Sequence, residues 1–473
     1  MNDLLNTKLI STLSCFTPSE WRFFKNFLIS GVAGPIGKSL EFYNLLTDYY
    51  PHFTHKDLNR NRVFKVLFAK QEYEDKKLRY VMTDLFKQAS SFLKFNALKF
   101  HPEESNYLLT SELAKRGADK AFLASYKSEE GNSLWDADYY FNRYREDLTY
   151  LNLYLPRQKR SMEHPIAAIA RNLDVFFVSR KLQLLCEIVN VRNVMSTEYD
   201  FILQEQIISV LKQGAFAEVP VIAIYFRIFM TLTEPDEVKN FFELKDLLSI
   251  NSNLFKRDEL RDMYQYLMNY CIKKINLGDS EYVKQLFKIY QLVIENKVLF
   301  TGDHLSQWDF KNIVVIGIRA DEAAWVFDFI EEFKKHLLFS ERENAYIYNM
   351  AYYCFSTGQY RKSLSLLRQV EFSDLYYQLD MRAILLKCYY EMDDQETFYY
   401  HTTAFKVFLS RNKLISDYQR VIYRNMIKYA TRLMKSYGNK KQLEQLLVEI
   451  EQVKQIADIN WLRKKIGETL WKK

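Results

Sequence analysis

Glycine and proline are scarce in this sequence. The 473 residues include only 12 glycines and 8 prolines, and no proline follows Pro235. Proline breaks helix interiors and glycine weakens them, so half of the chain lacks the usual breakers of long helices. Hydrophobic residues make up 48% of the chain and charged residues 26%, which permits a large buried core and excludes wholesale disorder. The composition therefore predicts an all-α protein with several domains or one elongated array.

Cysteines and long apolar runs are also few. The five cysteines lie far apart and fit no metal-binding motif, which predicts buried thiols in a reducing compartment. The most apolar stretch, Val219 to Phe226, is much shorter than the ~20 residues that span a bilayer. The start of the chain, with Asp3 before any apolar run, does not resemble a signal peptide. We therefore expect a soluble cytoplasmic protein without a membrane span.

Motifs that carry catalysis or bind cofactors are missing as well. Gly37-Lys38-Ser39 ends like a phosphate-binding loop, but the position five residues before Gly37 is Val32 rather than glycine. His52 and His55 have the spacing of zinc ligands, yet no pattern of cysteines or carboxylates accompanies them. We therefore expect no enzyme activity, no cofactor and no metal. An active site assembled from distant helices remains a third possibility.

Clear helix signals occur in the N-terminal hundred residues. Thr17-Pro18-Ser19-Glu20 is a capping box with proline in the first turn, and Gly31 is expected to end the helix that follows. Further helices are predicted at residues 40–49, 61–70 and 77–98. The run from Pro156 to Pro165 is the best linker candidate. These observations predict four segments: an N-terminal bundle (1–100), a hairpin and linker (101–160), middle hairpins (161–300) and helical repeats (301–473).

A repeat of paired helices is visible in the second half of the chain. The turn candidates are Gly278, Asp321, Gly358, Asp394 and Gly438, spaced by 43, 37, 36 and 44 residues. Apolar or small residues recur eight positions before each turn, as stacked pairs require because a lone pair cannot bury its inner face. The run from Ile313 to Ile316 has strand propensity, but the N-cap signal at Ser306 favours a helix. The pattern predicts an α-solenoid of helical hairpins.

One unit of this array resembles a tetratricopeptide repeat. Ala351 is the small residue seven before Gly358, Tyr360 follows two after it, Ser363 fills the second small position, and the closing proline is missing. The whole chain is similar to a group of uncharacterised bacterial all-helical proteins. The resembling segments are Pro18–Leu28, Lys311–Val314 with Trp325, Leu385–Glu391 and Phe408–Ser416, whereas Ser30–Pro35 departs from the pattern. The resemblance implies a helical-repeat fold with degenerate tetratricopeptide-like units, and it implies no activity.

The C-terminal region carries a cationic helix face. Residues 401–473 hold 16 Lys and Arg against 6 Asp and Glu, whereas the remaining 400 residues sum to −3. Basic residues spaced by three and four from Arg420 to Lys435 lie on one side of an amphipathic helix. Its opposite side carries Ile422, Tyr423, Met426, Ala430, Leu433 and Met434.

Two interpretations of this cationic face stay open. It is either a solvated surface, partly neutralised by Glu444, Glu449 and Glu451, or a docking surface for an acidic protein segment or nucleic acid. We predict a non-catalytic scaffold or adaptor that binds a protein segment, either in a concave groove or on this face. The alternative is a nucleic-acid-binding helical-repeat protein. The candidate partner-binding residues are Arg411, Lys413, Arg420, Arg424, Lys428 and Arg432.

Overall fold

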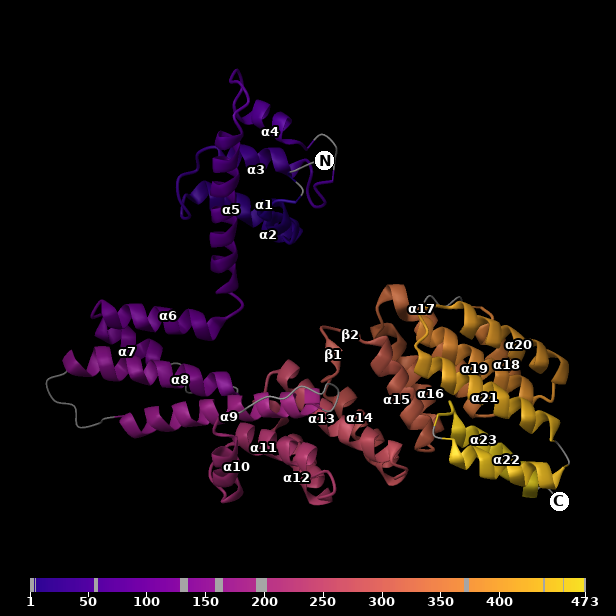
Figure 1. Cartoon of the computed structure of the whole chain (residues 1–473). Helices are drawn as coiled ribbons and strands as arrows, with labels where there is room; N and C mark the ends of the chain where they lie inside the picture. The colour runs from indigo at the N-terminus through magenta and orange to yellow at the C-terminus, as the bar shows by residue number, and fades with distance from the viewer. Residues whose placement is uncertain are drawn as a thin grey trace. The chain divides into compact units, whose positions relative to one another are not determined.

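The chain is almost entirely helical. A computed structural model describes residue 4 and residues 6–54, 58–127, 135–157, 165–192, 202–369, 374–436, 439–453 and 455–471. These residues form 23 α-helices and one short β-hairpin, which confirms the predicted all-α class. The chain divides into two compact units, Met1–Arg180 and Lys181–Lys473 (Figure 1). The four segments expected from the sequence stay predictions.

The first unit contains α1 to α8 and most of α9. The helices are α1 (Lys8–Ser14), α2 (Pro18–Ser30), α3 (Ser39–Thr47), α4 (Arg60–Leu67), α5 (Asp75–Ala97), α6 (Pro102–Lys115), α7 (Asp119–Lys127), α8 (Ala137–Thr149) and α9 (Ile166–Arg192). A π-helical turn (Tyr150–Tyr154) and a 3-10 turn (Leu155–Arg157) extend α8.

An aromatic core holds the first five helices together. Trp21 on α2 stacks between Tyr43 and Tyr50, with ring centroids 4.6 Å from each. The Tyr43 hydroxyl donates to the Trp21 carbonyl (2.8 Å), and the Tyr50 hydroxyl donates to that of Phe16 (2.6 Å). Rings of this size fill the space between helices, while their hydroxyls satisfy backbone groups. Tyr43 and Tyr50 thus serve both packing and hydrogen bonding.

The second unit is a longer series of helices. The α-helices after α9 are α10 (Gln204–Lys212), α11 (Pro220–Thr233), α12 (Val238–Asn251), α13 (Arg257–Asn276), α14 (Glu281–Glu295), α15 (Gln307–Arg319), α16 (Ala323–Phe333), α17 (Phe339–Ser356), α18 (Tyr360–Leu367), α19 (Leu375–Glu391), α20 (Gln395–Arg411), α21 (Asp417–Lys435), α22 (Lys440–Gln452) and α23 (Ile459–Trp471). Strands β1 (Phe300–Thr301) and β2 (His304–Leu305) pair antiparallel between α14 and α15. Short 3-10 turns follow α12 (Ser252–Leu254) and α16 (Lys334–His336).

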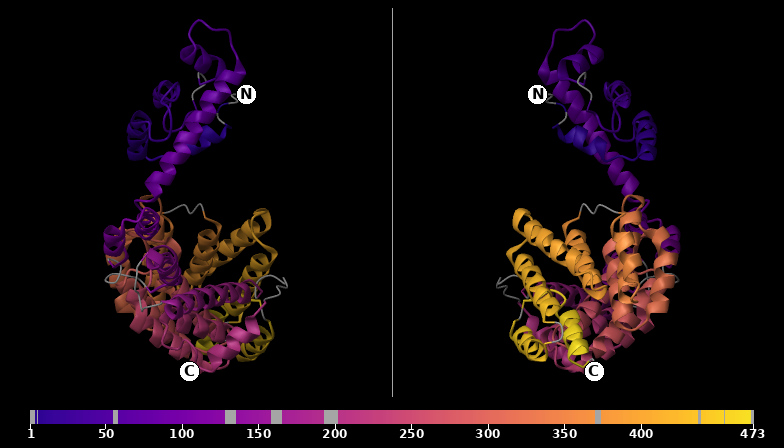
Figure 2. Two further views of the ribbon diagram at one scale, coloured as in Figure 1. Left: turned by 90° about the vertical axis from the view of Figure 1, so that its left-hand side faces the viewer. Right: turned by 90° about the vertical axis from the view of Figure 1, so that its right-hand side faces the viewer.

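Helices of the second unit pack mainly on their neighbours in sequence (Figure 2). Hairpins form between α11 and α12, α13 and α14, α15 and α16, α17 and α18, α19 and α20, and α21 and α22. Within the α17–α18 hairpin, the Ser363 hydroxyl donates to the carbonyl of Ala351 (2.8 Å), and both residues are fully buried. Small side chains at these two positions therefore let the helices approach closely. Ala351 and Ser363 are the two small positions that the resemblance to a tetratricopeptide repeat predicts.

Most helix boundaries agree with the sequence signals. Thr17 and Glu20 form the predicted capping box, and Gly31 ends α2 in the left-handed region. The β-branched run before Gly317 lies in α15, whose N-cap is Ser306 as predicted. Glycines 278 and 358 adopt positive φ at their turns. Gly438, His55 and most of the proposed linker lie outside the described residues.

Three features differ from the prediction. Helix α1 precedes the helix expected to be first, and its N-cap Thr7 gives a weaker signal than the capping box. The turn after α19 is centred one residue earlier than predicted, because Asp393 has the positive φ and Asp394 caps α20. Cys15 is exposed, whereas the other four cysteines are buried free thiols as expected.

Candidate functional site

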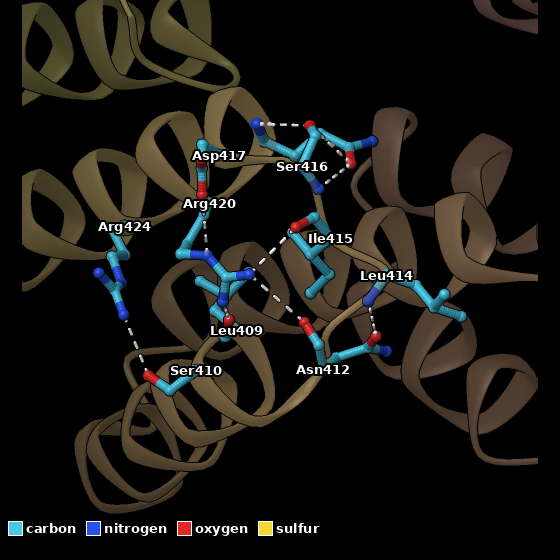
Figure 3. A network of polar contacts seen from close by, with 10 residues as sticks. Leu409, Ser410, Asn412, Leu414, Ile415, Ser416, Asp417, Arg420 and Arg424 are labelled. Carbon is cyan, nitrogen blue, oxygen red and sulfur yellow. Dashed lines mark hydrogen bonds and ion pairs between the residues drawn. The ribbon is translucent and has the colours of Figure 1, made fainter.

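The predicted cationic face is divided between structural contacts and exposed charge. Arg420 lies on α21 and points back at the end of α20, where its guanidinium donates to the carbonyls of Leu409, Asn412 (3.4 Å) and Ile415 (3.0 Å), as Figure 3 shows. Carbonyls at a helix end lack intrahelical partners. The single Arg420 guanidinium therefore supplies hydrogen bonds to carbonyls at the end of α20 and in the following loop. The role expected for Arg420 in partner binding stays a prediction.

Arg432 and Arg424 also have partners within the chain. The Arg432 guanidinium forms a two-pronged ion pair with Glu449 on α22, which is one of the three carboxylates expected to neutralise this face. The hydrogen bonds from Arg432 lower the pKa of the Glu449 carboxyl. Arg424 donates to the Ser410 hydroxyl (3.1 Å) but stays largely exposed (Figure 3). The pair Arg432–Glu449 therefore ties α21 to α22.

Four of the six predicted residues are solvent-exposed. Arg411 ends α20, Lys413 lies in the loop, and Arg424 and Lys428 project from α21. Three exposed apolar residues lie in the same loop and in the first two turns of α21: Leu414, Tyr418 and Val421. Leu414 extends away from the Arg420 guanidinium in Figure 3. We call the set Arg411, Lys413, Leu414, Tyr418, Val421, Arg424 and Lys428 the tip patch.

The contacts of Arg420 give a testable prediction. Replacing Arg420 with Met leaves three carbonyls without their charged donor, and we expect the free energy of unfolding to fall by about 2 kcal/mol. Arg411→Met removes the same charge from an exposed position and should change that free energy by less than about 0.5 kcal/mol. Urea denaturation of the two variants measures both values. Equal losses would contradict a capping role for Arg420.

A second constellation joins the first helices of four successive hairpins. The Asp380 carboxylate on α19 accepts hydrogen bonds from Lys311 on α15, the Tyr348 hydroxyl on α17 (3.4 Å) and the Tyr423 hydroxyl on α21 (2.9 Å). Burial and the neighbouring Asp380 raise the pKa of both tyrosines, so their hydroxyls remain donors. One carboxylate thus brings α15, α17, α19 and α21 together.

Aromatic side chains border this carboxylate. Trp308 at the start of α15 stacks on Tyr377 (5.2 Å between ring centroids) and meets Tyr376 edge-on (6.3 Å). Trp308 and Tyr376 are exposed, whereas Tyr377 is buried. We call Trp308 and Lys311 of α15, together with Tyr376 and Asp380 of α19, the four-helix face, because Asp380 joins α15, α17, α19 and α21. It offers exposed aromatic surface beside a paired acid and base.

The same side of α19 carries two further ion pairs with the C-terminal helix. Asp380, Lys387 and Glu391 are spaced by seven and four residues, which places them on one face of α19. Lys387 binds Asp458, which precedes α23 (2.7 Å), and Glu391 binds Lys465 on α23 (2.8 Å). Helix α23 is therefore held against α19 beyond the four-helix face.

The sequence contained one signal for these residues. Lys387 stands in the apolar run Leu385-Leu386-Lys387-Cys388-Tyr389, where a charged side chain without a buried partner would be costly. That position indicates a buried ion pair, but it does not identify Asp458, which is 71 residues away. Tyr423 packs against the core from the apolar side of α21, as expected, and its hydroxyl also donates to Asp380.

A cavity of about 530 Å³ lies among α10, α11 and α12. Its lining is mainly apolar, and its charged side chains include Arg227 and Glu243, which bind each other (2.7 Å). Lys212 and Asp246 are the other charged residues among the described lining.

The residues that the structure describes contain neither a metal-binding cluster nor a membrane-spanning helix. No cluster of three or more His, Cys, Asp or Glu side chains in these residues could hold a metal ion. None of the helices formed by these residues has the length and apolar content needed to cross a bilayer.

The chain is an all-helical protein with many paired helices, which is the coarse fold that the resemblance implies. No protein-family model, curated protein or solved structure matches it.

Proposed function

We propose that the protein is a non-catalytic, cytoplasmic scaffold that binds a protein segment on the four-helix face. In this proposal the second unit is an α-solenoid with tetratricopeptide-like units. Such arrays use the first helices of successive hairpins as a continuous binding surface. The observation that carries the proposal is the joining of α15, α17, α19 and α21 at Asp380.

The chemistry of the four-helix face suits a peptide. Exposed Trp308 and Tyr376 offer flat apolar surface, and aromatic residues dominate the energy of protein interfaces. The neighbouring Lys311 and Asp380 place a positive and a negative group beside this aromatic surface. The five free cysteines suit a reducing compartment such as the cytoplasm.

Site-specific photocrosslinking tests this proposal. A photoreactive phenylalanine analogue would replace Trp308 or Tyr376 and, as a control, Tyr400, which is exposed on α20 outside the four-helix face. We expect a discrete protein adduct from the first two positions in living cells and none from Tyr400. Adducts of equal yield at all three positions, or at none, would contradict the proposal. Adducts removed by nuclease would indicate the nucleic-acid-binding alternative instead.

A further inference from the structure

The tip patch presents apolar side chains on a rigid support. Leu414 is 82% exposed and Tyr418 61% exposed, which is unusual for large apolar residues clustered at one turn. The loop beneath them is fixed, because the Asn412 side chain accepts a hydrogen bond from the Leu414 amide (2.9 Å) and Ser416 forms a capping box with Gln419. Arg420 binds the loop carbonyls from below. The fixed loop therefore keeps these apolar side chains exposed to solvent.

Positive charge surrounds these apolar residues. Arg411 and Lys413 lie on the loop side, and Arg424 and Lys428 lie along α21. Two carboxylates lie nearby: Asp417 is exposed, 3.9 Å from the Arg420 guanidinium, and Glu449, close to Lys428, is paired with Arg432. The four cations of the patch outnumber them. Arg424 and Lys428 are four residues apart on α21. Like charges at this spacing on a helix repel one another, so these two residues do not stabilise α21. The tip patch is complementary to an anionic surface.

The shape of the tip patch favours a lipid surface over the other anionic partners. Helical peptides dock into grooves, whereas Leu414 and Tyr418 protrude at a turn. Single-stranded nucleic acid needs flat rings for stacking of successive bases, and the tip patch offers only Tyr418, because Leu414 and Val421 have no ring. At a membrane interface, protruding Leu and Tyr side chains enter the headgroup region while Lys and Arg contact anionic lipids. We propose that the tip patch binds the surface of an anionic phospholipid bilayer.

Vesicle co-sedimentation tests this site independently of the four-helix face. The full chain would be mixed with vesicles of phosphatidylcholine alone or of an equimolar mixture of phosphatidylcholine and phosphatidylglycerol. We expect binding only to the mixed vesicles. Lys413→Gln and Lys428→Gln should each weaken binding about fivefold. Leu414→Ser should weaken it roughly tenfold through loss of apolar burial, and the charge-matched control Lys284→Gln on α14 should bind like the wild type.

Several outcomes would overturn the proposal. Equal binding to both kinds of vesicle, binding to neither, or unchanged binding by Leu414→Ser would each do so. Beside the two kinds of vesicle, soluble polyuridylate or polyglutamate is tested as a polyanion without lipid. If either polymer binds the wild type as tightly as the mixed vesicles do, and Leu414→Ser binds it equally well, the tip patch is a polyanion site without lipid selectivity. Thermal melting of each variant checks that the exposed substitutions leave the fold intact.

Discussion

Asp458→Asn should lower the free energy of unfolding by about 3 kcal/mol, whereas Lys387→Met should change it by less than about 1 kcal/mol. The asymmetry follows from burial, since the Lys387 side chain is 6% exposed and that of Asp458 is 46% exposed. Asparagine keeps an oxygen that can accept a hydrogen bond, but the buried ammonium group loses its counter-ion. Replacing the lysine with methionine fills the same space, and water can still solvate Asp458.

The choice of asparagine and a double variant separate the loss of the ion pair from backbone strain and other sources of instability. Asp458 has a φ of 52°, and asparagine tolerates this left-handed conformation, so the substitution should not strain the backbone. The double variant Lys387→Met with Asp458→Asn should be about as stable as Lys387→Met alone, because the buried charge is gone. Chemical denaturation of all four proteins completes the cycle. Additive losses in the double variant would contradict the ion-pair account.

The same pair predicts a dependence on alkaline pH. Burial alone would lower the pKa of Lys387, but the charge of Asp458 and the hydrogen bond to it outweigh burial and raise the pKa above 10.5. A raised pKa contributes stability that is complete below the unfolded value and is lost as the pH rises through the folded value. The difference between the wild type and Asp458→Asn should therefore narrow above pH 10.5.

Local signals were sufficient to predict most of the helices. Capping residues such as Thr17 and Ser306 act within one turn of the chain, and positive-φ glycines such as Gly358 end helices without tertiary contacts. Helix α1 was missed because it is only seven residues long and depends on packing against α5 rather than on its own propensity.

The candidate sites were less accessible from the sequence. The spacing of basic residues indicated a cationic face, but periodicity does not show which guanidinium groups turn back into the chain. Arg420 and Arg424 are four residues apart on the same helix, yet only Arg420 reaches the carbonyls at the end of α20. The contacts of Asp380 join residues from 32 to 69 positions away, which no local pattern records.

Close packing of α15 makes Gly317 the most sensitive glycine to substitution among those described. An added Cβ at this position would lie 2.4 Å from Val326 Cγ2 and 3.3 Å from Phe287 Cε2. Val326 is fully buried on α16, and its β-branched side chain has little rotational freedom. Gly317→Ala should therefore lower the free energy of unfolding by about 2 kcal/mol, although alanine favours the helical state by about 1 kcal/mol over glycine.

Gly467 provides the matched control for this prediction. It also lies inside a helix, α23, but a Cβ there would meet no heavy atom within 4 Å. Gly467→Ala should consequently raise the free energy of unfolding by up to about 1 kcal/mol, because only the helix preference changes. Val326→Ala combined with Gly317→Ala should lose less stability than the two single changes added together, since the clash is relieved. If Gly317→Ala instead matches Gly467→Ala, the helices α15 and α16 pack less closely than the distances indicate.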